Sequence, residues 1–158
     1  MFREFMGLPA HALLVHAAVV FIPLLALVGS GYALLPRFRA RLDWAAAALA
    51  VAAPMAALFA KLSGDELREV LIAKSYPPEI IAKIDEHQAY GDLAFWWSLG
   101  LGLVTLLLVV LTARRGRTLP GWLTPVLSAV IVVLAAVSLW YVYLTGDSGA
   151  QVVWQGVL

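Results

Sequence analysis

The three histidines of this sequence and three of its five aspartates are the residues whose types and positions are suited to metal or redox chemistry. These six candidate residues are His11, His16, His87, Asp65, Asp92 and Asp147. Imidazole nitrogens bind haem iron, zinc and copper, and carboxylate oxygens can complete a zinc or copper site. The chain has no Cys, which excludes disulfides, thiolate metal sites, iron–sulfur clusters and a cysteine nucleophile.

The same residue types recur in the two halves of the chain. His11 is followed five residues later by His16, and His87 is followed five residues later by Asp92. In addition, Ser63-Gly64-Asp65 and Thr145-Gly146-Asp147 open the shared pattern [Ser/Thr]-Gly-Asp-x3-[Glu/Gln]-Val-apolar. These matches predict two copies of a two-span hairpin, residues 1–75 and 76–158, with the same orientation in a membrane.

The histidines allow three interpretations of the site. One imidazole from each half, His16 with His87 or His11 with His87, would supply the two axial ligands of a haem b. All three histidines with one of the aspartates would instead bind zinc or copper. In the third interpretation there is no cofactor, and the polar groups only tie helix ends together.

His16 is the most informative of the three because it lies inside an apolar run, where an ionisable side chain is costly and therefore a functional candidate. A neutral His16 hydrogen-bonded to a neighbouring helix is the structural alternative. Five residues turn a helix by about 500°, so His11 and His16 point about 140° apart and do not easily share one ion.

The elements that must position these residues are membrane spans, as the composition indicates. Hydrophobic residues make up 63% of the 158-residue chain and charged residues 13%, with a net charge of +1. Soluble domains average about 45–50% hydrophobic and about 25% charged residues. This balance excludes a disordered chain, a nucleic-acid-binding domain and an ordinary cytosolic enzyme.

Four uncharged runs are long enough, at about 20 residues, to cross a bilayer as helices. They cover residues 12–35, 44–60, 93–112 and 122–144. The first is longer than the apolar region of a signal peptide, so we expect a span and not a cleaved leader. The sequence therefore predicts an all-α, integral membrane four-helix bundle, a single transmembrane domain over residues 1–158.

The connections predict the orientation. Arg37, Arg39 and Arg41 follow the first run, and three more arginines (Arg114, Arg115 and Arg117) follow the third. By the positive-inside rule both connections are cytoplasmic, which puts both termini and the middle connection outside. The six candidate residues then gather around one outer pocket. Within the middle connection, apolar spacing in residues 66–74 and after Pro77-Pro78 predicts two short amphipathic helices on the outer surface.

Several of these motifs together resemble the bacterial membrane proteins catalogued as domain of unknown function 2231. They are the stretch GLPAHALLVH at residues 7–16, the Ser-Gly-Asp turn, His87 three residues before Tyr90-Gly91, and the final Gly-Asp-x-Gly-Ala-x-Val-Val. The resemblance covers nearly the whole chain and implies four spans with functional positions at His11, His16 and His87. This sequence departs from the family pattern in having Ala12 for a usual Pro and Ala17-Ala18 for Phe-Pro.

The resemblance also implies redox work, because relatives occur beside c-type cytochrome and Rieske-type domains. It favours haem b over copper or zinc. We therefore expect an electron-transfer protein of the bacterial inner membrane, which passes electrons from quinol to an outer-face cytochrome or similar acceptor. The alternative is a cofactor-free accessory subunit, and the helices could also pair in a homodimer or a larger membrane complex.

Overall fold

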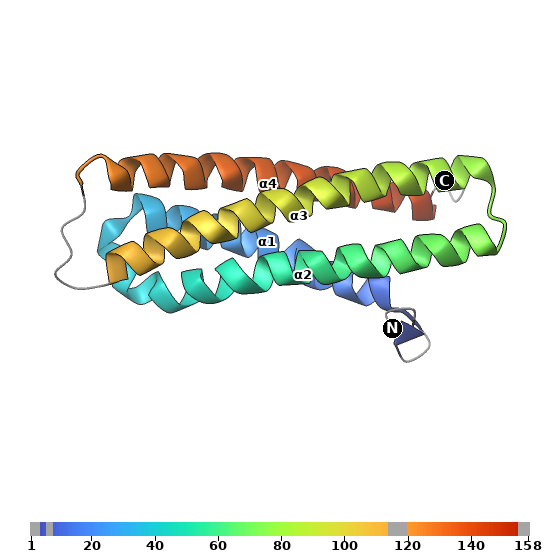
Figure 1. The fold of residues 1–158 in the computed structure, drawn as a ribbon, viewed down its shortest axis with the longest axis horizontal. Helices are drawn as coiled ribbons and strands as arrows, with labels where there is room; N and C mark the ends of the chain where they lie inside the picture. Colours follow the sequence, from blue (N-terminus) through green and yellow to red (C-terminus); the bar gives the residue numbers. More distant parts are fainter. Residues whose placement is uncertain (1–3, 6–7, 114–119, 155–158) are drawn as a thin grey trace.

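The computed structural model describes residues 4–5, 8–113 and 120–154, and these form an all-α bundle (Figure 1). Four long helices dominate it: α1 (Ala10–Leu34), α2 (Arg39–Ala73), α3 (Pro78–Ala113) and α4 (Leu123–Trp154). A short 3₁₀ helix, η1 (Pro36–Phe38), joins α1 to α2, and the two-residue strands β1 (Glu4–Phe5) and β2 (Leu8–Pro9) pair antiparallel before α1. The prediction of four apolar helices packed together is confirmed, and all four are long and apolar enough to cross a membrane.

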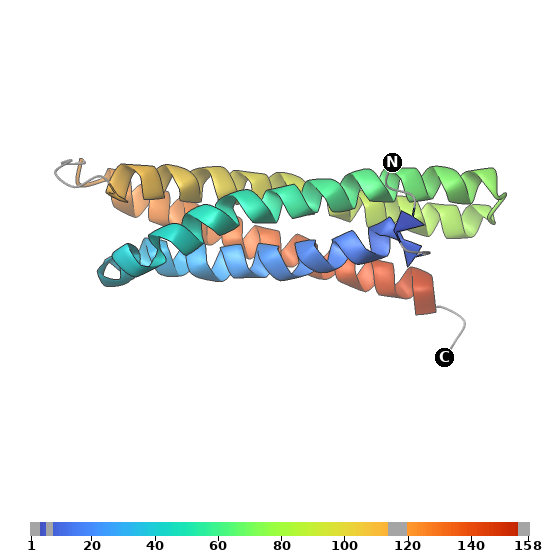
Figure 2. The same cartoon turned by 90° about the horizontal axis from the view of Figure 1, so that it is seen from below.

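The helices run alternately up and down, so that each packs against its neighbours in the chain and α4 returns to α1 (Figures 1 and 2). This order leaves α1 diagonally opposite α3. The start of α1, the end of α4 and the turn between α2 and α3 lie at one end of the bundle, here called the hairpin end. The opposite end carries Arg37 and is called the arginine end. The predicted cluster Arg114, Arg115 and Arg117 lies outside the described residues.

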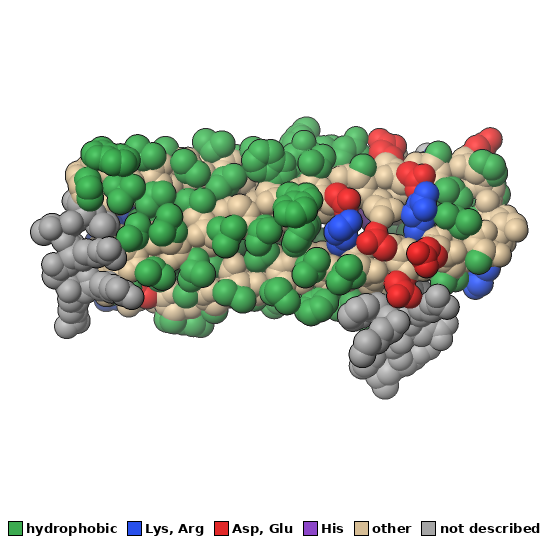
Figure 3. Space-filling view, viewed as in Figure 1, with side chains coloured by type: hydrophobic (Ala, Val, Ile, Leu, Met, Phe, Trp, Pro, Cys, Tyr) green, Lys and Arg blue, Asp and Glu red, His purple; other side chains and the backbone are tan. Residues whose placement is uncertain are grey.

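The helices are longer than the apolar runs that predicted them. At 1.5 Å per residue, the 35 residues of α2 extend over about 52 Å, whereas the hydrocarbon core is about 30 Å thick. Figure 3 shows hydrophobic side chains over most of the visible face and the charged ones gathered toward the hairpin end. Part of the bundle, with residues 61–73 of α2 and 78–92 of α3, therefore continues beyond the apolar section and is here called the charged extension.

The prediction of two separate amphipathic helices between the second and third spans is wrong. Residues 66–73 continue α2 without a break, and the segment that begins at Pro78 is the first part of α3. No proline interrupts residues 61–73, and Gly64 is accommodated inside the helix. The chain reverses only at Ser75, whose φ of 57° is left-handed.

Small residues bring α2 close to its neighbours. The buried face of α2 is mostly alanine, and Ala46 and Ala53 are fully buried. A Cβ on Gly102 of α3 would collide with the Ala50 backbone oxygen, so α2 and α3 cross there at a separation that only glycine allows.

A buried hydrogen-bond cluster ties the helices together at the arginine end. The hydroxyl of Tyr32, which is fully buried, donates to Asp43 Oδ1 (2.7 Å) and lies 2.6 Å from Thr112 Oγ1. Arg39 Nε donates to the Tyr32 carbonyl (3.0 Å) and its Nη2 to the Ala33 carbonyl (3.1 Å), which satisfies the last turn of α1. No repeat or motif in the sequence pointed to this cluster.

Candidate cofactor site

Two histidines from diagonally opposite helices meet inside the charged extension. His11 is in the first turn of α1, and His87 is in the first third of α3. Their ring centroids are 6.2 Å apart and their planes are nearly perpendicular, at 87°. Both side chains are half-buried between the helices.

Each ring is fixed by the helix that follows it in the chain. His11 Nδ1 lies 3.0 Å from the carbonyl oxygen of Ala60 and 3.2 Å from Ser63 Oγ, both on α2. The Ser63 hydroxyl donates to the same carbonyl (2.8 Å). A carbonyl oxygen can only accept, so Nδ1 of His11 carries the proton and Nε2 keeps its lone pair.

His87 repeats this arrangement on the other side of the bundle. Its Nδ1 lies 3.0 Å from the carbonyl oxygen of Thr145 and 3.2 Å from Ser148 Oγ, both on α4. The Ser148 hydroxyl again donates to the carbonyl that accepts from the histidine (3.2 Å). The two imidazoles are thus held as the same tautomer by the same two kinds of group, a backbone carbonyl and a serine hydroxyl.

A glycine lies against each ring. A Cβ at Gly64 would stand 3.2 Å from His11 Cε1, and one at Gly149 would stand 2.9 Å from His87 Cε1. Both glycines lie within their helices and do not end them. They provide the space into which the rings fit.

These contacts change the correspondence between the two halves of the chain. The sequence pattern aligned Ser63-Gly64 with Thr145-Gly146, but the pair that makes the equivalent contacts is Ser148-Gly149, three residues later. The available signal was a Ser-Gly pair 52 residues after His11 and 61 residues after His87. The Asp that follows Gly64 has no counterpart after Gly149, so the residues that the Gly-Asp match aligned do not make equivalent contacts.

The histidine pair borders a cavity of about 660 Å³ that receives side chains from all four helices. Apolar residues line it at the end nearer the bundle centre, among them Ile22, Ala57 and Val142. Toward the hairpin end it is bordered by Leu71 and Ile84. Charged or polar side chains line the part of the cavity between its two ends. A volume of this size falls in the range of cofactor and ligand pockets, about 300–1,000 Å³.

His16 lines the same cavity but is not part of the pair. Its side chain is exposed, and Nδ1 lies 2.5 Å from the carbonyl oxygen of Ala12 in its own helix. His11, by contrast, is directed to α2. The different directions agree with the angle expected from a five-residue separation on one helix.

The aspartates are distributed over separate surroundings. Asp92 lines the cavity and pairs with Lys61 Nζ (2.6 Å). Asp65 accepts from Gln88 and lies 3.9 Å from Lys61 Nζ. Asp147 accepts from Gln151 (2.8 Å) and borders a different cavity of about 100 Å³.

The expectation that all six candidate residues surround one pocket therefore holds for the histidines and Asp92, but not for Asp65 and Asp147. Over residues 10–113 and 120–154, no three His, Asp or Glu side chains come together in a way that could hold a metal ion. The side chains that would form a zinc or copper centre with three nitrogens and one oxygen do not converge there.

Fold and site define this chain as a four-helix membrane protein whose charged extension contains a histidine pair. The chain belongs to the family described as "Predicted membrane protein (DUF2231)", whose model matches residues 7–158. The family resemblance seen in the sequence is thereby confirmed. No curated protein and no solved structure matches the chain.

Proposed function

We propose that this protein binds haem b and transfers electrons in the membrane, with His11 and His87 as the axial ligands. The observation that carries the proposal is the pair of imidazoles 6.2 Å apart, each with Nδ1 on a backbone carbonyl. Two metal–imidazole bonds of about 2 Å, plus the two ring radii, separate the ring centroids by about 6 Å. A carbonyl that accepts from the remote nitrogen is the usual partner of a metal-binding histidine.

Haem suits this site better than a bare metal ion because the protein offers two converging ligands. The porphyrin supplies the other four nitrogens of an iron centre, whereas zinc in proteins needs three or four ligands from side chains. The cavity is largely apolar and lies between facing helices, where bundle proteins build cofactor sites. A single copper ion between the two imidazoles remains the competing metal.

The proposed ligand pair is His11 and His87. The position of His16 in the first apolar run had favoured the pair His16 and His87. His16 and His87 come from opposite halves of the chain, but His16 hydrogen-bonds within its own helix and is exposed. The His11–His87 alternative is supported by their proximity and by their equivalent partners on α2 and α4.

The second candidate function is that of an accessory subunit without a cofactor. The hydrogen bonds of His11 and His87 would then only join α1 to α2 and α3 to α4. That role accounts for the hydrogen bonds of the two Nδ1 atoms. It gives no reason for the two rings to lie 6.2 Å apart beside a cavity of about 660 Å³.

We further infer that the two halves, residues 1–75 and 76–158, derive from one duplicated two-helix unit, since each contributes a His, a carbonyl, a Ser and a Gly to the same local arrangement. The arginines of the α1–α2 connection favour a cytoplasmic arginine end in a bacterial inner membrane. The histidine pair would then lie near the outer face, between quinol in the bilayer and an acceptor such as a cytochrome.

The test is an absorption spectrum of the detergent-purified protein, produced with haem supplied and without chelator, before and after reduction with dithionite. We expect sharp reduced α and Soret bands in the wild type and in His16→Ala, and their loss in His11→Ala and His87→Ala. A colourless, metal-free wild type would refute the redox function. Stoichiometric copper or zinc in the same sample would indicate that the site binds a metal ion instead of haem.

A further inference from the structure

The cavity beside the histidine pair is largely apolar at both ends, but its hairpin end carries a guanidinium group. Toward the bundle centre its lining includes Ile22, Ala57 and Val142. Toward the hairpin end the guanidinium-bearing Arg68 lies among apolar residues such as Leu71 and Ile84. Arg68 follows Gly64 by four residues on α2, so its Cα lies about 6 Å farther from the bundle centre than the glycine against His11.

Arg68 is held at this position by α3. Its Nε lies 2.5 Å from Asp85 Oδ1 and its Nη2 lies 3.2 Å from Asp85 Oδ2, a two-point contact between the helices of the hairpin. Asp85 lies in the charged extension, and the hydrogen bond from Arg68 lowers the pKa of its carboxyl group. The pair is therefore ionised at neutral pH and keeps the guanidinium oriented.

The guanidinium has more donors than Asp85 uses. Arg carries five N–H groups in a planar fork, and two of its nitrogens face Asp85. Since Arg68 also lines the cavity, the remaining donors are available to a second acid. Lys61, the other cation of the lining, is already in a 2.6 Å contact with Asp92.

We propose that Arg68 binds a carboxylate of the ring cofactor held between His11 and His87, and thereby sets its orientation. This inference rests on the haem function proposed above. Haem b is amphipathic, with two carboxylates on one edge of the ring. Its acidic edge points to the hairpin end, and its apolar edge points to Ile22, Ala57 and Val142. The opposite orientation would direct two charges toward the apolar inner end, where the lining cation Lys61 is already paired with Asp92, and this is unfavourable.

The experiment compares binding of haem b and of its dimethyl ester, in which both carboxylates are blocked, to the purified apoprotein by spectroscopic titration. The variants are Arg68→Met, which removes the charge and keeps a long side chain, and Arg68→Gln as a second, polar replacement. Lys74→Met is the matched control, because Lys74 is exposed near the α2–α3 turn and does not border the cavity. Circular dichroism establishes that each variant is folded.

For the wild type and Lys74→Met we expect haem b to bind more tightly than the ester. For Arg68→Met and Arg68→Gln we expect haem b to lose about tenfold to a hundredfold in affinity, as for a lost charged hydrogen bond, while the ester binds as before. If haem b and the ester lose equally, or if neither is affected, Arg68 does not bind the carboxylate and the proposal is overturned. If the wild type binds haem b and the ester equally well, the carboxylate proposal is overturned but the haem function is not. A wild type that binds neither refutes both.

Discussion

At the residue scale, each histidine of the pair owes its position to three groups on the next helix: a carbonyl, a hydroxyl and a glycine. The carbonyl fixes the tautomer, the hydroxyl shares the carbonyl, and the glycine leaves room for the ring. A change to any of them acts on the imidazole and not on a cofactor directly. The glycines give the sharpest test because Ala adds a single methyl group.

We expect Gly149→Ala to displace the His87 ring and to lower haem affinity at least tenfold. The added Cβ would stand 2.9 Å from His87 Cε1 and 3.1 Å from Nδ1, and the ring cannot retreat without losing its bond to the Thr145 carbonyl. Haem titration of the purified variant is the measurement.

Gly31→Ala is the control for this substitution. Gly31 lies near the end of α1, does not border the cavity, and among the described residues no atom beyond its own helix lies within 4 Å of an added Cβ. Ala is favoured over Gly in a helix by about 0.5–1 kcal/mol, so this variant should bind haem normally. Equal affinities of the two variants would show that the fit of the His87 ring does not matter.

The sequence identified the histidines as candidates but not which of them form a pair. His16 drew attention because it lies inside an apolar run, whereas the partner chosen by the fold is His11, five residues earlier. Which face of α1 turns inward depends on how α1 packs against α2, and sequence spacing within α1 does not contain that information. The sequence motif contained Ser63 and Gly64, but their contacts with His11, and the role of Ser148 and Gly149 beside His87, were missed for the same reason.

At the scale of elements, the helix centres were predictable and the helix ends were not. Uncharged runs of 17 residues or more can only be buried or lie in lipid, so their number and order followed from composition. The residues after Lys61 suggested two separate surface helices, but a polar sequence without proline continues an existing helix at little cost. The Ser-Gly-Asp motif looked like a turn because glycine commonly ends helices, whereas Gly64 lies within α2 and makes room for His11.

We expect Gly102→Ala to destabilise the bundle by about 1–3 kcal/mol, the usual cost of overpacking a well-filled interface. The added methyl group would meet the Ala50 carbonyl oxygen, which is backbone and can move away only if α2 and α3 separate. The thermal unfolding midpoint of the detergent-solubilised protein, followed by circular dichroism, measures the effect.

Gly100→Ala on the same helix provides the comparison. Its Cβ would lie 3.8 Å from Leu134 Cδ2, an ordinary contact, so the variant should be at least as stable as the wild type. A Gly102→Ala variant with an unchanged or higher midpoint would mean that α2 and α3 are not in close contact at this point.

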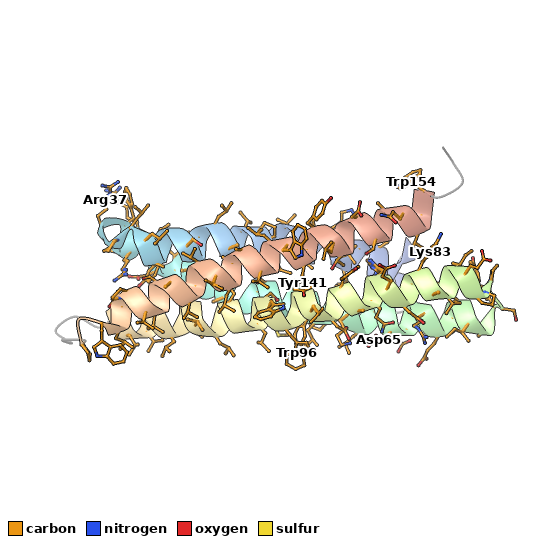
Figure 4. The ribbon with its side chains drawn as sticks, turned by 90° about the horizontal axis from the view of Figure 1, so that it is seen from above. Arg37, Asp65, Lys83, Trp96, Tyr141 and Trp154 are labelled. Atoms are coloured by element: carbon orange, nitrogen blue, oxygen red, sulfur yellow. The ribbon has the colours of Figure 1, made fainter. Side chains whose placement is uncertain are left out.

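At the scale of the whole molecule, the bundle has an apolar section and the charged extension (Figure 3). The extension holds the histidine pair. Trp96 and Tyr141 lie near the middle of the bundle's length, and Asp65 and Lys83 lie toward the hairpin end (Figure 4). Trp and Tyr favour the membrane–water interface, which suggests that the bilayer ends near these residues. The site then lies on the aqueous side of the aromatic belt, and its exposure to one compartment or the other depends on how the chain inserts.

Because the chain has no Cys, single cysteines can report that orientation. Lys74→Cys places a thiol beside the α2–α3 turn, and Ala40→Cys places one at the arginine end while leaving Arg37, Arg39 and Arg41 in place; both positions are exposed. The arginines resist translocation, so we expect a membrane-impermeant maleimide to label Lys74→Cys on intact spheroplasts and Ala40→Cys only after the membrane is opened. The reverse pattern would put the histidine pair in the cytoplasm and exclude an acceptor on the outer face. Labelling of both on intact spheroplasts would contradict a bundle whose two ends lie on opposite sides of the membrane.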